Sequence, residues 1–137
     1  MYHEQLFPSH IKLCDFLHSK GIKVILHSCG GVRSLTPGFM EAGFDCLEPL
    51  EVKSGMDLVE LKRSFGEKLV FMGGIDVRAM ANPDPAVIEE EIRTKVITAK
   101  KSGGYIYHSD HSVPDNVSFK QYQRVMELVK RYGLYSD

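Results

Sequence analysis

The sequence predicts an α/β protein in which parallel β/α units form half of an eight-stranded barrel. Short apolar runs rich in β-branched residues alternate with longer segments of helical periodicity, and glycines end most of the helical segments. Each apolar run leads into a loop rich in glycine and polar residues, whereas the turns from helix into strand are brief. Strands that alternate with helices pair in parallel through right-handed crossovers.

The pattern predicts the element order α-βαβαβαβα. The first strand, Ile22 to Leu26, is mostly apolar and β-branched, which is typical of a parallel strand buried on both faces. The other three strands are expected at residues 44–47, 69–72 and 105–107. Five helices are expected to begin at Pro8, Thr36, Met56, Asp84 and Ser118.

Four parallel strands are compatible with two architectures. One is a small open sheet with helices on both faces, and the other is half of a TIM-type (β/α)8 barrel. In both, functional residues lie at the carboxyl ends of the strands. No linker or low-complexity segment interrupts the pattern, so residues 1–137 are predicted to form a single domain.

Composition narrows the possible functions and locations. The 17 Lys and Arg residues nearly balance the 18 Asp and Glu residues, which argues against a nucleic-acid or membrane-surface partner. The N-terminal segment does not resemble a signal peptide, and no stretch is apolar enough to span a bilayer, so a cytoplasmic location is expected. Cys14 and Cys46 lie in apolar segments and are expected to be buried and unreactive.

The segment His27-Ser28-Cys29 is the sharpest chemical feature of the sequence. Imidazole and thiolate are preferred zinc ligands, and residues i and i+2 at a strand end point to the same side. Gly30 and Gly31 allow the backbone to turn sharply directly afterwards. The alternative is a capped strand end with a buried cysteine and an incidental histidine.

A zinc site needs three or four ligands, and the loop after the last strand is the natural source of another. His108, Asp110 and His111 in that loop are all chemically able ligands. Asp110 and His111 are equally able to form an acid/base pair, in which the carboxylate fixes the imidazole tautomer. An Asx-type turn before Pro114 is the structural alternative.

Carboxylates follow the second and third strands. Glu48 and Glu51 flank Pro49 and are able to bind substrate, ligate metal or transfer protons, with Glu51 favoured because Pro49 stiffens its loop. The structural alternative for both is a solvated loop charge paired with Lys53. Asp76 follows a glycine turn that lacks the spacing of a nucleotide-binding motif, and an ion pair with Arg78 is expected there.

Nearly the whole chain resembles the C-terminal half of the uroporphyrinogen decarboxylase superfamily, which includes cobalamin-dependent methyltransferases. The stretches that carry the resemblance run in family order: Leu26 to Gly30, Phe44 to Pro49, Phe71 to Asp76, Gly103 to Ile106 and on through Val113-Pro114. The family fold is a (β/α)8 barrel, so the resemblance implies its last four β/α units and the helix before them.

Two enzyme branches follow from the resemblance. In the methyltransferase branch a His-x-Cys pair, matched by His27 and Cys29, binds zinc together with a ligand after the last strand, usually Cys, where this chain has Asp110. That zinc serves methyl transfer to or from a corrinoid, which implies a corrinoid protein as partner. The decarboxylase branch removes carboxyl groups from a tetrapyrrole without metal, using arginine and aspartate residues of the N-terminal half.

The methyltransferase-like assignment is favoured, with zinc held by His27, Cys29 and Asp110, and with Glu51 and His111 as candidate catalytic residues. Tetrapyrrole decarboxylation in porphyrin biosynthesis is the alternative enzyme function. A third hypothesis is a non-catalytic half-barrel subunit or fragment. A half barrel exposes strand edges and the flank of its core, so a complementary N-terminal half-barrel or a homo-oligomer is expected to cover them.

Overall fold

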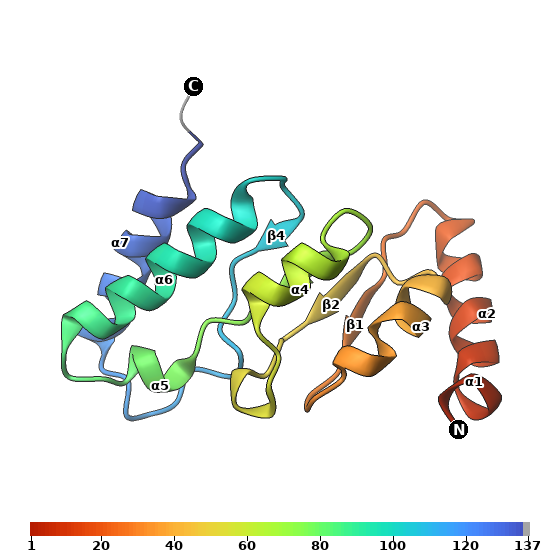
Figure 1. Cartoon of the computed structure of the whole chain (residues 1–137), viewed down its shortest axis with the longest axis horizontal. Helices are drawn as coiled ribbons and strands as arrows, with labels where there is room; N and C mark the ends of the chain where they lie inside the picture. The colour runs from red at the N-terminus through yellow and green to blue at the C-terminus, as the bar shows by residue number, and fades with distance from the viewer. Residues whose placement is uncertain (136–137) are drawn as a thin grey trace.

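The computed structural model describes residues 1–135 and contains one four-stranded parallel sheet. The strands are β1 (Ile25–His27), β2 (Cys46–Glu48), β3 (Val70–Met72) and β4 (Tyr105–Ile106). They lie in chain order, so β1 and β4 form the two edges (Figure 1). The predicted α/β class with parallel β/α units is confirmed.

Helices connect the strands and cover one face of the sheet (Figure 1). They are α1 (Tyr2–Gln5), α2 (Phe7–His18), α3 (Thr36–Glu41), α4 (Leu58–Phe65), α5 (Val77–Met80), α6 (Pro85–Lys100) and α7 (Phe119–Gly133), with 3-10 turns at Arg33–Leu35 and Val52–Ser54. Among the described residues, no helix has the length and apolar character needed to cross a membrane.

Local sequence signals explain where the longer helices begin. Asp84 caps α6 through a bond from the Ala86 N–H, and Pro85 occupies the first turn, where its missing N–H costs nothing. Ser118 and Gln121 form a reciprocal capping box at the start of α7. Both predicted starts are confirmed, whereas α4 begins at Leu58 rather than Met56 because Asp57 caps it.

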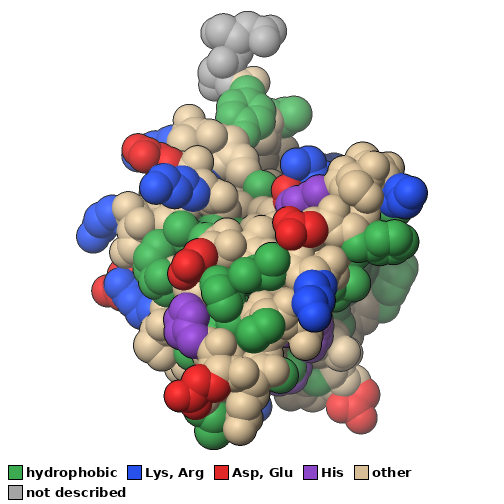
Figure 2. Space-filling model, turned by 90° about the vertical axis from the view of Figure 1, so that its right-hand side faces the viewer, with side chains coloured by type: hydrophobic (Ala, Val, Ile, Leu, Met, Phe, Trp, Pro, Cys, Tyr) green, Lys and Arg blue, Asp and Glu red, His purple; other side chains and the backbone are tan. Residues whose placement is uncertain are grey.

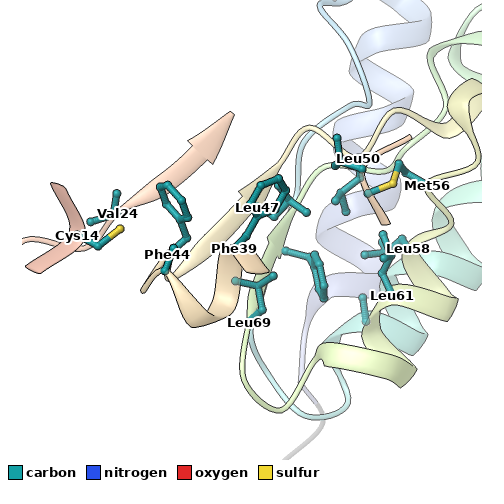
Figure 3. Packing of buried hydrophobic residues seen from close by; sticks show 14 residues of the cluster. Cys14, Val24, Phe39, Phe44, Leu47, Leu50, Met56, Leu58, Leu61 and Leu69 are labelled. Carbon is teal, nitrogen blue, oxygen red and sulfur yellow. The ribbon is translucent and has the colours of Figure 1, made fainter. Parts of the chain in front are cut away.

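The main hydrophobic core lies between the sheet and the helices. One row of the sheet, formed by register partners on all four strands, faces this core: Leu26, Leu47, Phe71 and Tyr105. Leu58 and Leu61 of α4 are fully buried against it, and Phe39 of α3 belongs to the same buried cluster (Figure 3). A second cluster packs α6 against α7.

The opposite face of the sheet is open in this chain. Because side chains alternate along a strand, Ile25 and Ile106 point away from the helices, and they are 52% and 44% exposed. The prediction that the first strand is buried on both faces is therefore wrong, since β1 is an edge strand and only one of its faces is covered. In a closed barrel this face lines the interior, so the architecture is half of a TIM-type barrel.

Exposed apolar side chains also occur at the N-terminal end. Leu13 and Phe16 of α2 and Leu6 before it are largely exposed. Figure 2 shows hydrophobic side chains among charged ones on the side of the molecule where α1 and α2 lie. This side and the open sheet face both present apolar side chains to solvent.

Asp45, directly before β2, joins α2 to the sheet. Its carboxylate accepts hydrogen bonds from His18 Nε2, Lys23 Nζ and the Val24 N–H, each at 2.8 Å. Burial raises the pKa of this carboxyl, but the hydrogen bonds from Lys23, His18 and Val24 outweigh burial and lower the pKa to about 2. The ionised form is therefore favoured in the folded protein.

The substitution Asp45→Asn is expected to lower the free energy of unfolding at neutral pH by up to about 2 kcal/mol. A carboxyl with a lowered pKa stabilises the fold above its unfolded pKa, and this contribution is lost as the pH falls through the folded pKa. Urea unfolding should show the difference between wild type and variant shrinking from about pH 4 to about pH 2. A difference that stays constant over this range would contradict the ion cluster, and Asp15→Asn on α2 is the matched control.

Candidate functional site

The loops after the strands gather at one end of the sheet, because all four strands are parallel. His27 at the end of β1 pairs in register with Glu48 at the end of β2, so their side chains lie on the same face. Gly30 has a φ of 83°, which a residue with a side chain rarely adopts, and this turn directs the chain away after Cys29.

His27 stands between Cys29 and Glu48. Its Nδ1 lies 2.6 Å from Glu48 Oε1, and its Nε2 lies 3.4 Å from Cys29 Sγ. Cys29 is exposed, whereas Cys14 and Cys46 are buried as predicted. Burial raises the pKa of the Cys46 thiol to about 11. Cys29 is thus the accessible thiol, with an imidazole and then a carboxylate aligned behind it.

A pocket of about 400 Å³ opens beside this chain of side chains. It is lined by the last residues of β1 and β2 and by residues of the loops after β1, β2 and β4: His27, Cys29, Glu48, Pro49, His108, His111 and Ser112. The structure therefore brings together the His27/Cys29 pair and both histidines of the last-strand loop, as expected for residues that share the carboxyl end of a barrel. Apart from Pro49, every lining residue carries a nitrogen, oxygen or sulfur atom in its side chain.

Glu51 is buried beside this pocket and does not line it. Its Oε2 accepts the Gly30 N–H at 2.7 Å, and its Oε1 lies 3.4 Å from Lys53 Nζ and 3.9 Å from His111 Nε2. The Gly30 hydrogen bond is the main reason that the pKa of this carboxyl is lowered. Glu51 is therefore ionised at neutral pH and acts as an acceptor between two loops.

Asp110 was predicted as a metal ligand, but its side chain is buried and bonded to the backbone. It is 2% exposed, and its two oxygens accept the N–H groups of Val52 and Val77 at 3.1 and 3.0 Å. Its own N–H donates to the Ile75 carbonyl at 2.8 Å. Asp110 thus ties together the loops after β2, β3 and β4. Within residues 1–135, the structure groups no three His, Cys, Asp or Glu side chains in a metal-binding arrangement.

The other polar residues singled out in the sequence have different surroundings. His108 Nδ1 lies 2.6 Å from the Ser109 carbonyl oxygen, and its side chain lines the pocket with Nε2 unbonded among residues 1–135. Asp76 pairs with Arg78 at 2.7 to 3.0 Å and caps α5, so its predicted ion pair is confirmed. Sequence reasoning favoured Glu51 over Glu48, whereas Glu48 is the carboxylate that contacts His27. Strand order would have indicated this contact, because His27 and Glu48 are the last residues of two adjacent parallel strands.

Replacing Asp110 by alanine is expected to destabilise the fold by about 2 to 4 kcal/mol, because two backbone N–H groups lose their charged acceptor. Asp110→Asn keeps one amide oxygen and should cost less. Thermal or urea unfolding of both variants measures the effect, with the exposed Asp115→Ala in the same loop as control. Unchanged stability in the alanine variant would contradict the tie between the three loops.

The fold and the pocket define a class of protein: half of a TIM-type barrel with a polar pocket at the carboxyl ends of its strands. A model of the family described as uroporphyrinogen decarboxylase (URO-D) matches residues 1–132, and the chain belongs to this family. The resemblance seen in the sequence is confirmed by this match.

A solved structure supports the same fold. The structure titled "methyltransferase from Methanosarcina mazei" superposes with a TM-score of 0.68 at 15% sequence identity. The match covers 96% of this chain and 36% of that chain, so the present sequence spans little more than a third of that protein. The search of curated proteins found no match.

Proposed function

We propose that this chain carries a zinc site for methyl transfer between a small methylated substrate or thiol and a corrinoid held by a partner protein. The observation that carries the proposal is the approach of His27 Nε2 and Cys29 Sγ to 3.4 Å at the edge of a polar pocket. Membership of the URO-D family and the fold shared with a methyltransferase support the proposal.

The distance between the two ligand atoms suits zinc. Zn–S and Zn–N bonds of about 2.3 and 2.0 Å at a tetrahedral angle place sulfur and nitrogen about 3.5 Å apart. The observed 3.4 Å is close to this value. Glu48 holds the other nitrogen of His27, which is the usual support of a zinc-bound imidazole.

For the third ligand, the loop after β4 offers two histidines and Asp110. Asp110 was the expected ligand, but its two oxygens are engaged by the backbone of other loops. His108 is the better candidate because it lines the same pocket and has Nδ1 anchored on a carbonyl. Its Nε2 would have to move toward the His27/Cys29 pair on metal binding, since no three such side chains are grouped within residues 1–135. His111 lies toward Glu51 instead.

The chain's own residues then have distinct tasks. Zinc, when bound, would supply a Lewis acid that activates a thiol or the methyl-bearing substrate. His27 and Cys29 would hold it, and His111, which lines the same pocket, would receive the substrate. Glu51, ionised and 3.9 Å from His111, would orient that imidazole.

Zinc content per chain tests this site. Near-stoichiometric zinc is expected in the wild type, with a loss of most of it in Cys29→Ser and His27→Ala. Cys14→Ser, which removes a buried thiol that does not line the pocket, should keep it. Elemental analysis of folded protein gives the readout. A folded wild type without zinc that binds a carboxylated tetrapyrrole would contradict methyl transfer and favour the decarboxylase alternative.

We further propose that the open sheet face is covered by a complementary N-terminal half-barrel or by a second copy. Ile25 and Ile106 lie exposed on this face, and an uncovered parallel sheet is rare. Sedimentation velocity is expected to show concentration-dependent association of the isolated chain, weakened in Ile106→Lys. A folded monomer at every concentration would contradict self-association and leave the complementary half as the partner.

A further inference from the structure

We infer that Glu48 is a positioning residue that fixes His27 in the Nδ1–H tautomer, so that the lone pair of Nε2 faces Cys29. The part of this inference that concerns zinc affinity rests on the proposed zinc site. The tautomer itself is a property of the chain alone and is measurable without metal.

The contact between Glu48 and His27 fixes which nitrogen of a neutral His27 ring carries the proton. An ionised carboxylate only accepts hydrogen bonds, so at 2.6 Å from Glu48 Oε1 the imidazole nitrogen Nδ1 must be the donor. A neutral imidazole carries one N–H and one lone pair, and the lone pair therefore falls on Nε2. That nitrogen faces Cys29 Sγ at 3.4 Å.

Glu48 is suited to this task because its carboxylate is bonded to His27 and to no other described residue. Glu51, by contrast, is held by Gly30 and Lys53. The Glu48 side chain is 18% exposed and comes from the strand adjacent to β1, so the β1–β2 register sets its position beside the ring.

The opposite tautomer would be unfavourable at Nδ1 and would leave Nε2 without a lone pair for a metal. The Nδ1 lone pair would face a carboxylate, and the Nε2–H would point at the sulfur that the site needs as a neighbouring ligand. Glu48 thereby links the pairing of two strands to the availability of a ligand nitrogen, which is how a carboxylate behind a metal-binding histidine acts.

The first test is the tautomer of the neutral His27 ring in metal-free protein, read from its side-chain ¹⁵N chemical shifts in a pH series that extends to the fully neutral form. We expect protonated Nδ1 in the wild type and in Glu48→Gln, whose amide oxygen still accepts. Glu48→Leu, of similar size without an acceptor, should shift His27 toward Nε2–H. Protonated Nε2 in the wild type, or an unchanged ring in Glu48→Leu, would overturn the inference.

The second test is zinc affinity from competition with a chromophoric chelator. We expect the order wild type, Glu48→Gln, Glu48→Leu, with a loss of about 10- to 100-fold in the last. The control is Glu60→Leu, which removes an exposed carboxylate on α4. Unchanged affinity in Glu48→Leu would overturn the part of the inference that concerns zinc affinity. A wild type that binds no zinc would sink the proposed site and leave the tautomer result standing.

Discussion

Parallel pairing of four strands in chain order is the constraint on which the site depends. It sends every strand-to-helix loop to the same edge of the sheet, where residues far apart in sequence meet. His27 and Glu48 become neighbours through strand register alone. Asp110 then locks the loops after β2, β3 and β4 by accepting two backbone N–H groups and donating one. Strand pairing and backbone hydrogen bonds therefore set the positions of the residues that line the pocket.

The same constraint explains what the chain leaves uncovered. Alternating side chains give the sheet one row that packs on α4 and its neighbours, and another row that faces the inside of a barrel. With four strands the barrel does not close, so Ile25 and Ile106 remain exposed at the two edge strands. The pocket opens on this side too, and a partner that completes the barrel would also form its missing wall.

Much of the fold could be predicted from sequence because its signals are local: Asp84-Pro85 and Ser118 begin helices where expected. The exposure of β1 could not be predicted from sequence, because an apolar run has the same composition in a central strand and in an edge strand. The His27/Cys29 pair is local as well and was found. The role of Asp110 was not predicted, because this role depends on backbone N–H groups that lie 58 and 33 residues away in the chain.

The most direct measurement on this site is zinc K-edge X-ray absorption of the zinc-loaded chain, because it counts the ligand atoms themselves. Coordination by His27, Cys29 and a histidine of the last-strand loop predicts one sulfur at about 2.3 Å and nitrogen ligands at about 2.0 to 2.1 Å. In Cys29→Ser the sulfur contribution should vanish. A zinc shell of only nitrogen and oxygen in the wild type would contradict the site.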